Sequence, residues 1–311
     1  MNTGIVIKST GSHYLVKQDE KIVNCKIRGR FRTKEYRTTN PVAVGDVVDF
    51  KIQKDKTSGV ITGIHERKNF LKRKSTNLSR KSHIIAANID YAFLMATLIK
   101  PVTYSMFIDR WLVACERNAV KPVLLFNKTD LYDEKLNKRL RLYIKIYENV
   151  GYYCLPISIK EKIGIEEVRK MISGKIIVIS GNSGVGKSSF LNLLEPGLML
   201  KTEEISESHE QGKHTTTFAE MIPVAGGFVI DTPGIKGFGL DETIKENLSD
   251  FFPEMRRMSG KCRFNNCTHT HEPECAVKDA VNKGEISSQR YNNYINILAD
   301  EEDKYRQDKY V

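Results

Sequence analysis

The segment ending in Gly186-Lys187-Ser188 has the residue types and spacing of a phosphate-binding loop, Gly-x4-Gly-Lys-Ser. An apolar run precedes it and an apolar helical pattern follows, so a strand, a loop and a helix start stand in the required order. Glycines allow backbone angles closed to other residues, and the amides of such a loop can surround phosphate oxygens. We expect Lys187 to reach the β- and γ-phosphates and the Ser188 hydroxyl to ligate Mg²⁺. The predicted nucleotide contacts here are Gly181, Asn182, Ser183, Gly184, Val185, Gly186, Lys187, Ser188 and Ser189.

Two further motifs, each after an apolar strand pattern, indicate that the nucleotide carries guanine. The first is Asn-Lys-Thr-Asp, and its Asp130 can accept hydrogen bonds from the ring N–H and the exocyclic amine of guanine. Adenine presents neither group in that geometry, so ATP would leave a buried carboxylate unpaired. We expect Asn127 and Lys128 to brace the neighbouring loops and flank the base. The second motif begins with Ser158 and Ile159, and the Ile159 N–H is expected to face the guanine oxygen.

The magnesium and γ-phosphate contacts are expected on two later segments. Asp231 lies at the end of a strand pattern in Asp-Thr-Pro-Gly, where it can hold a Mg²⁺-bound water while the Gly234 N–H meets the γ-phosphate. Between the phosphate loop and Asp231 lies Gly-Lys-His-Thr-Thr-Thr at 212–217. A Mg²⁺-ligating threonine is expected there, and we favour Thr216 over Thr215.

Hydrolysis needs a polar group that orients the attacking water. Ile235 follows the Asp-Thr-Pro-Gly motif and cannot do this, so His214 is the nearest candidate, although a surface histidine in a loop would give the same pattern. Together with the phosphate contact Lys187 and the Mg²⁺ ligand Thr216, His214 completes the set of predicted catalytic residues. Ile235 also predicts slow intrinsic hydrolysis that a partner accelerates by completing the site.

The order of the motifs along the chain predicts a circular permutation. In most GTPases the phosphate loop comes first, whereas here the Asn-Lys-Thr-Asp motif and Ser158 precede it. The sheet can stay unchanged if the chain ends have moved, because chain termini usually lie at the surface. The segment after Asp231 then leads directly into the C-terminal region.

Three cysteines and a histidine near the C-terminus have the spacing of a structural zinc site. Cys262, Cys267, His269 and Cys275 supply three thiolates and one imidazole, the soft ligands that tetrahedral Zn²⁺ prefers. His271 is a rival fourth ligand. The other cysteines, Cys25, Cys115 and Cys154, lie in apolar patterns and are expected in hydrophobic cores.

The positive charge is concentrated in the first quarter of the chain. Residues 1–85 contain 19 Lys and Arg against 7 Asp and Glu, a net charge of +12, within a total of +11. This asymmetry favours a polyanionic partner such as nucleic acid over a merely basic surface. The segment 28–37 interleaves cations with Phe31 and Tyr36, which can stack on bases or instead tuck into a core. A second basic stretch, 66–81, is a linker or another phosphate contact.

The pattern predicts a multidomain chain. Residues 1–67 show short strands without helical periodicity, as in a small all-β barrel of OB type. A basic linker, 68–90, leads to strand–helix alternation over 91–240, which indicates a central α/β circularly permuted P-loop GTPase. Residues 241–311 are expected to form a helical zinc-binding domain. No apolar run is long enough to span a membrane and no secretion signal is evident, so we expect a soluble, cytoplasmic monomer.

Five segments carry a resemblance to a known family: Ile27–Arg32, Thr39–Asp46, Ile85–Asp90, Gly212–Thr217 and Cys262–Ala276. Together with the order of the nucleotide motifs, they resemble the ribosome-small-subunit-dependent GTPases of the RsgA/YjeQ type. The resemblance implies GTP/GDP, Mg²⁺ and one structural Zn²⁺ as cofactors. It also implies binding to the small ribosomal subunit and its rRNA, a role in late subunit maturation, and hydrolysis stimulated by the subunit. By resemblance His214 positions water, and the four residues of the cysteine cluster bind zinc. The sequence departs slightly from the family at Lys213 and Ile159.

Two other functions remain open at this point. An RNA-binding module could use GTP only as a ligand that stabilises its fold, in which case the subunit would not change GTP turnover. A GTPase of tRNA modification or membrane trafficking is the other alternative.

Overall fold

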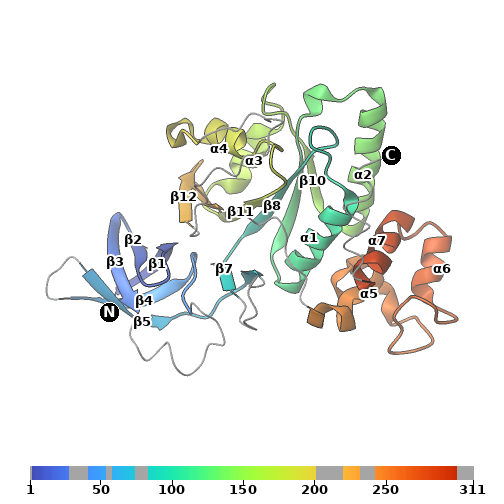
Figure 1. Ribbon diagram of the computed structural model, residues 1–311, viewed down its shortest axis with the longest axis horizontal. Coiled ribbons are helices and arrows are strands. Elements are labelled where there is room, and N and C mark those ends of the chain that lie inside the picture. Colours follow the sequence, from blue (N-terminus) through green and yellow to red (C-terminus); the bar gives the residue numbers. More distant parts are fainter. Residues whose placement is uncertain are drawn as a thin grey trace, which may run out of the picture.

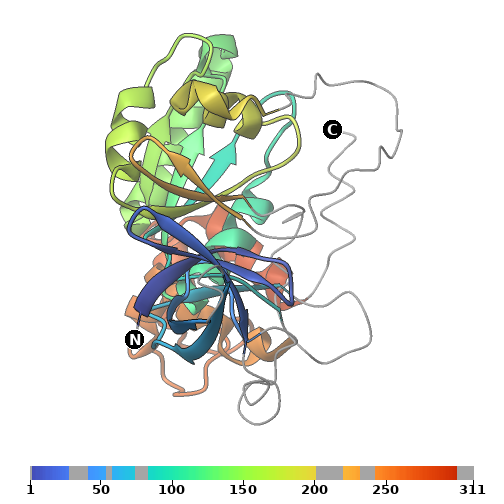
Figure 2. The same cartoon turned by 90° about the vertical axis from the view of Figure 1, so that its left-hand side faces the viewer.

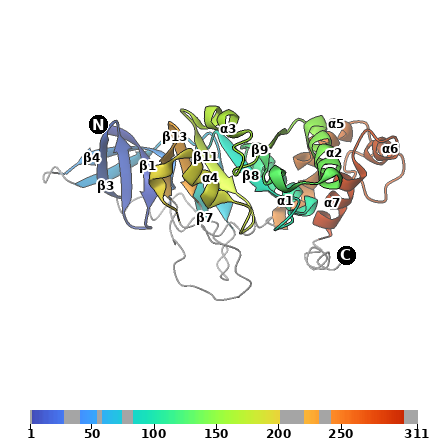
Figure 3. The same ribbon diagram turned by 90° about the horizontal axis from the view of Figure 1, so that it is seen from above.

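The computed structural model describes residues 2–27, 41–53, 58–73, 83–200, 220–231 and 242–299. Three parts lie in a row: an N-terminal barrel, a central α/β domain and a group of C-terminal helices (Figures 1 and 3). The predicted residues His214, Thr215, Thr216, Gly234 and Ile235, and the basic segment 28–37, lie outside the described residues.

The N-terminal part is a closed five-stranded barrel. Its strand order is β1-β2-β3-β5-β4, and β4 pairs back onto β1. The interior holds alternate residues of each strand, for example Val6, Tyr14, Val16 and Phe50. This architecture confirms the predicted barrel of OB type. The strands are β1 (Asn2–Ser9), β2 (Tyr14–Gln18), β3 (Lys21–Ile27), β4 (Val47–Ile52) and β5 (Ser58–Ile64).

The range predicted as a basic linker contains a strand pair, β6 (Phe70–Arg73) and β7 (His83–Ala87). The barrel packs closely on this pair, because a Cβ at Gly45 (φ +91°) would lie 2.1 Å from the Ala87 carbonyl oxygen. Beside it, the Arg67 guanidinium donates to both carboxylate oxygens of the fully buried Asp46, at 2.6 and 2.7 Å. The short pair therefore anchors the barrel.

The central domain is a six-stranded sheet in the order β10-β9-β8-β11-β13-β12, in which only β12 is antiparallel to its neighbour. Strands β12 and β13 form a hairpin around Ala225-Gly226. Lys8 of the barrel pairs with Glu220 at the edge of this sheet, with an Nζ–Oε2 distance of 2.7 Å. Figure 2 looks onto the barrel next to this hairpin. The strands are β8 (Tyr91–Ala96), β9 (Lys121–Phe126), β10 (Tyr153–Pro156), β11 (Ile176–Ser180), β12 (Glu220–Val224) and β13 (Gly227–Asp231).

Helices cover both faces of this sheet. Because successive side chains on a strand point to opposite faces, Leu94 packs in the core under α1 and α2, while Phe93 and Met95 pack in the core under α3 and α4. Residues buried on both faces explain the continuous apolar strand patterns. The helices are α1 (Ser105–Arg117), α2 (Glu134–Val150), α3 (Ile165–Ile172) and α4 (Lys187–Leu194), with short 3-10 turns η2 (Thr129–Leu131) and η3 (Pro196–Leu198).

The C-terminal part is helical and has its own core. Phe252, Met255, Val277 and Tyr294 pack together there, and Val113 of α1 joins them from the central domain. The last described helix of the chain is α7, and residues 300–311 lie outside the described part. The elements are η4 (Glu242–Phe251), α5 (Pro253–Ser259), α6 (Ala276–Asn282) and α7 (Ser288–Leu298).

Within the described ranges, no helix is both long and apolar enough to cross a membrane.

Candidate nucleotide site and metal centre

The predicted nucleotide loops follow the carboxyl ends of neighbouring parallel strands. The chain passes outward from β8 through β9 to β10 and then returns to place β11 on the other side of β8. The boundary between β8 and β11 is thus a topological switch point, where α/β sheets leave a crevice for ligands. The glycine-rich loop follows β11, the Asn127 loop follows β9 and the Ser158 loop follows β10.

Two glycines in the loop after β11 are required by its geometry. Gly181 has φ +147°, and a Cβ there would lie 2.5 Å from the Met95 carbonyl oxygen of β8. Gly186 has φ +104°, and a Cβ there would lie 2.7 Å from Nδ2 of Asn127. Any side chain at either position would force the loop apart from the neighbouring strands.

Lys187 lies over the loop that precedes it. Its Nζ donates to the carbonyl oxygens of Gly181 at 2.7 Å and Asn182 at 2.8 Å. Helix α4 begins at Lys187, and no side chain caps its N-terminus at Gly186. A glycine-rich loop, a helix start without a side-chain cap and an ammonium group together suit a phosphate chain.

Asn127 joins the three loops. Its side chain is buried, its Nδ2 donates to the Val185 carbonyl at 2.8 Å, and its Oδ1 accepts from the Ile159 N–H at 3.4 Å. The predicted bracing role of Asn127 therefore has a direct geometric basis. The Ile159 N–H, expected to face guanine, points instead at Asn127 in this structure.

Asp130 is held by the Ser158 loop. The Ser158 hydroxyl donates to Oδ1 of Asp130 at 2.6 Å and accepts from the Glu161 N–H at 3.0 Å. The Thr129 hydroxyl donates to the Ile157 carbonyl at 2.9 Å, which ties the same two loops together. Oδ2 of Asp130 has no hydrogen-bond partner among the described residues. The carboxylate is thus oriented by one oxygen while the other can accept from a ligand.

Lys128 and Tyr132 fix the Asn127 loop to the loop after β8. Lys128 adopts a left-handed conformation, and its Nζ donates to the Lys100 carbonyl. Burial lowers the pKa of Lys128, and the nearby Asp130 opposes this shift. The Tyr132 hydroxyl donates to the Asn127 carbonyl at 2.8 Å and accepts from the Leu98 N–H at 2.9 Å. No local pattern indicated this role of Tyr132, because its partner Leu98 is distant along the chain.

The remaining predicted nucleotide contacts are placed only in part. Asp231 is the last residue of β13, the strand next to β11, so its backbone lies at the same edge as the glycine-rich loop. The predicted catalytic and magnesium positions His214 and Thr216 lie outside the described residues, as does Gly234.

The four residues of the predicted zinc site lie together in the C-terminal part. The ligand atoms of Cys262, Cys267, His269 and Cys275 are all within 4.8 Å of one another. Nδ1 of His269 is 3.7 Å from Sγ of Cys262 and 3.5 Å from Sγ of Cys275. Tetrahedral zinc with ordinary bond lengths would separate such a nitrogen and sulfur by about 3.6 Å. The donor set therefore fits a tetrahedral metal ion.

The surroundings of this cluster favour His269 over His271. The Tyr291 hydroxyl donates to the His269 carbonyl at 2.7 Å, and His269 is 1% exposed, whereas His271 is exposed and lies outside the cluster. Burial, with the neighbouring thiols, raises the pKa of Cys267 to about 12. A bound cation would reverse that shift, because metal ligation stabilises the thiolate. The other three cysteines are buried core residues, as predicted.

The C-terminal helices attach to the central domain through an ion network that the sequence did not reveal. Arg290 of α7 is 1% exposed, and its Nη1 donates to Oδ1 of Asp109 on α1 at 2.5 Å. Its Nε and Nη2 donate to the carboxylate of Glu254 on α5, at 2.7 and 3.0 Å. Asn293 donates to the second Asp109 oxygen at 2.5 Å. These partners are far apart in sequence, so no local pattern indicates them.

The fold and these sites define a circularly permuted P-loop nucleotide-binding protein that carries an N-terminal barrel and a C-terminal Cys3His cluster. Two family models match the chain, RsgA GTPase over residues 64–241 and RsgA N-terminal domain over residues 3–61. The chain belongs to the RsgA GTPase family and is a GTP-hydrolysing enzyme.

Relatives and solved structures match nearly the whole chain. It is 49% identical to the small ribosomal subunit biogenesis GTPase RsgA of Flavobacterium psychrophilum, covering 99% of this chain and 96% of the relative. The protein of the same name from Phocaeicola vulgatus is also 49% identical, covering 97% and 98%. The crystal structure of YjeQ from Thermotoga maritima has a TM-score of 0.79 at 35% identity, covering 96% and 98%. The crystal structure of YloQ, a circularly permuted GTPase, has a TM-score of 0.75 at 32% identity, covering 98% and 96%.

Proposed function

We propose that this GTPase binds the small ribosomal subunit through its rRNA, hydrolyses GTP to GDP and phosphate when the subunit completes its site, and acts in late subunit maturation. One observation carries the proposal. Asn127 links the Asn-Lys-Thr-Asp loop to the phosphate loop through a buried 2.8 Å bond to Val185, in a chain whose close relatives bear the name of that function.

The guanine base is recognised by the loops after β9 and β10. Asp130 accepts from the ring N–H and the exocyclic amine, while the Ser158 hydroxyl keeps the carboxylate in place. Lys128 flanks the base, and the Ile159 N–H turns from Asn127 to the guanine oxygen. The hydrogen bond from the Ile159 N–H to Asn127 is long at 3.4 Å and therefore weak, so little free energy is lost when a guanine oxygen replaces Asn127 as the acceptor.

The triphosphate is bound by the loop from Gly181 to Ser189. Lys187 leaves the loop carbonyls and pairs with the β- and γ-phosphates, where its charge stabilises the transition state. Ser188 and Thr216 would hold Mg²⁺ directly and Asp231 would hold it through water, and the ion would neutralise charge at the phosphate oxygens. The Gly234 N–H meets the γ-phosphate.

His214 orients the attacking water when the subunit is bound. Hydrolysis without the subunit is slow in this proposal, because the residue after Asp-Thr-Pro-Gly is the aliphatic Ile235, which cannot hold the attacking water. Residues 1–67 supply a basic barrel for rRNA, residues 68–90 a connection, residues 91–240 the GTPase and residues 241–311 a helical domain folded around one structural Zn²⁺. The protein acts as a monomer in the cytoplasm, where this partner occurs.

GTP turnover with and without purified small subunits tests the proposal. We expect strong stimulation of the unmodified protein. Lys187→Ala should lower the stimulated rate about 100- to 1,000-fold, since it removes a charge that acts on the transition state. Lys175→Ala, which removes an exposed lysine just before β11, is the matched control and should keep full activity.

If small subunits leave the rate of GTP turnover unchanged, the result would favour the alternative, an RNA-binding module stabilised by GTP. Stimulation by free tRNA rather than by subunits would favour a GTPase of tRNA modification. His214→Ala should lower the stimulated rate and spare GTP affinity, and a loss of affinity would instead assign His214 to binding.

A further inference from the structure

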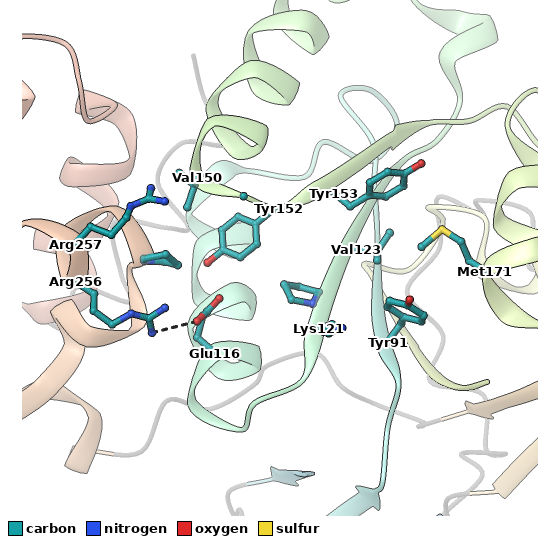
Figure 4. A pocket seen from close by; sticks show the side chains of 13 residues that line it. Tyr91, Glu116, Lys121, Val123, Val150, Tyr152, Tyr153, Met171, Arg256 and Arg257 are labelled. Carbon is teal, nitrogen blue, oxygen red and sulfur yellow. Dashed lines mark ion pairs between the residues drawn. The ribbon is translucent and has the colours of Figure 1, made fainter. Parts of the chain in front are cut away.

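A cleft of about 600 Å³ lies at the amino ends of the central strands, whereas the nucleotide loops follow their carboxyl ends. Its floor is the amino ends of neighbouring strands, where β8 starts at Tyr91, β9 at Lys121 and β10 at Tyr153. Its other wall is α5 of the C-terminal part, as Figure 4 shows. The volume falls within the usual range of ligand sites, about 300–1,000 Å³.

The charge of the cleft is positive. Arg256 and Arg257 of α5 and Lys121 of β9 line it, against one acid, Glu116. Arg256 pairs with Glu116 at 3.5 Å, and the side chains of Arg256 and Glu116 are 53% and 19% exposed. Arg257 has no ion-pair partner among the described residues. Three cations against one anion suit a ligand that carries phosphate.

The side of the cleft away from the arginines carries aromatic rings. Tyr91 and Tyr153 lie there, and Tyr153 is 42% exposed although it is a large ring at the edge strand of the sheet. The Tyr153 hydroxyl donates to Glu167 of α3, which fixes the ring while part of it stays accessible. Exposed, fixed rings beside cations are the pattern that binds single-stranded nucleic acid.

Tyr152 supplies a polar group without a partner. The residue is 6% exposed and lines the cleft, yet its buried hydroxyl has no hydrogen-bond partner among the residues that the structure describes. Figure 4 shows this hydroxyl turned toward Glu116 and Arg256. Burial raises the pKa of Tyr152, so the hydroxyl stays protonated and able to donate. A buried donor without an acceptor is costly, and a ligand oxygen would remove that cost.

We propose that this cleft binds one nucleotide of a single-stranded RNA segment, with its phosphate on Arg256 and Arg257 and its base against Tyr153. The Tyr152 hydroxyl then donates to a sugar or phosphate oxygen. An acidic peptide would match the charge but would leave the aromatic surface uncovered. The inference rests on the proposed function, because rRNA is the RNA concerned. It adds a contact that spans the GTPase domain and the C-terminal helices.

Photo-crosslinking with a 5′-phosphorylated 4-thiouridine hexanucleotide tests the cleft in the full-length protein. Mass spectrometry of the crosslinked peptides should find the RNA on Tyr153 or on its neighbour in the cleft, Tyr91. Arg256→Ala with Arg257→Ala should lower this crosslink about tenfold or more, and the matched control Arg141→Ala, on the exposed side of α2, should not. A wild-type protein without crosslinks at these tyrosines, or an unchanged yield in the double variant, would overturn the proposal.

Two substitutions at Tyr153 distinguish the stacking of a base on its aromatic ring from a general disturbance of the fold. Tyr153→Phe keeps the aromatic face and should retain the crosslink at Tyr91, whereas Tyr153→Leu should lose most of it. Equal yields from both variants contradict base stacking. An excess of a peptide that contains Glu and Phe could also remove the crosslinks at the cleft tyrosines and at no other residue. That result would mean that the cleft binds a protein partner instead of RNA.

The same variants distinguish this inference from the proposed function. If small subunits stimulate turnover equally, with unchanged affinity, in wild type and in the double arginine variant, the cleft proposal fails while the function stands. If the crosslink is present but subunits never stimulate turnover, the cleft stands and the function fails. In the double arginine variant, GTP turnover without subunits should be unchanged, because the cleft and the nucleotide loops lie at opposite ends of the strands.

Discussion

The nucleotide loops and the C-terminal helices are attached to the same central domain in different ways. The loops are joined mainly by hydrogen bonds, such as that from Asn127 to Val185, and by two positions where only glycine fits. The C-terminal helices are joined by fully buried charges around Arg290 and contain a cluster of four potential metal ligands. The first arrangement leaves polar groups available to a ligand, whereas the second satisfies them inside the protein.

The Arg290 network shows how costly this second arrangement is to disturb. The Arg290 guanidinium also lies over Phe252, 4.8 Å from the ring centroid, with Tyr147 and Tyr152 each at 5.6 Å. One cation faces two carboxylates, and burial raises the pKa of the Asp109 carboxyl while Arg290 opposes that rise. Charges removed from water in this way must stay paired, so the network holds α5, α7 and α1 in one arrangement. Motion of the C-terminal helices as separate units is therefore not expected.

The largest effect is expected from the metal cluster. Cys275→Ser should lose the bound zinc and unfold the C-terminal helices, because structural zinc contributes on the order of 10 kcal/mol to the folding of small domains. Metal content per chain and limited proteolysis measure both results. Cys154→Ala, which alters a buried thiol in the central core, should keep one zinc per chain.

The two histidines sharpen the same prediction. His269→Ala should lose zinc, whereas His271→Ala should retain it. The opposite result would make His271 the fourth ligand.

A smaller effect is expected at the charged network. Arg290→Met should destabilise the protein by about 3–5 kcal/mol, because it leaves two buried carboxylates without their cation. Urea unfolding can be followed by the fluorescence of Trp111, the one tryptophan of the chain, which is buried in α1. Arg263→Ala removes an exposed arginine paired with Glu274 and should cost about 0–1 kcal/mol. Equal losses for the two variants would mean that the buried network contributes no more than a surface pair.

The smallest effect is expected at the base-binding loop, where a substitution changes specificity rather than folding. Asp130→Asn should weaken GTP binding about 10- to 100-fold, because a hydrogen bond to a charged group is lost and an acceptor becomes a donor. Xanthosine triphosphate presents a carbonyl where guanine has an amine, so the variant should bind it better than wild type does. Titration with both nucleotides measures the switch. If the GTP affinity of the variant is unchanged, Asp130 does not contact the guanine base.

Much of the fold and of the nucleotide site could be predicted because it depends on short-range patterns. The glycine-rich loop, its strand and its helix occupy adjacent residues, so spacing alone indicated their order. The alternation of strands and helices over residues 91–240 indicated the α/β domain, and the short strands of residues 1–67 indicated a barrel. The strand pair β6–β7 was not predicted, because neither short strand, Phe-Leu-Lys-Arg or His-Ile-Ile-Ala-Ala, shows the alternation of apolar and polar residues by which strands are recognised.

By itself the sequence determined which chemical groups this protein has and their order along the chain: a phosphate loop, a guanine-type motif ahead of it, and three thiols with a histidine. Only the tertiary structure decided which distant groups meet. It placed Arg290 between Asp109 and Glu254, Tyr132 between Asn127 and Leu98, and two arginines of α5 opposite the tyrosines of the sheet. The physical reason is that periodicity records which face of an element is buried, whereas the partner of a buried charge is set by packing between elements.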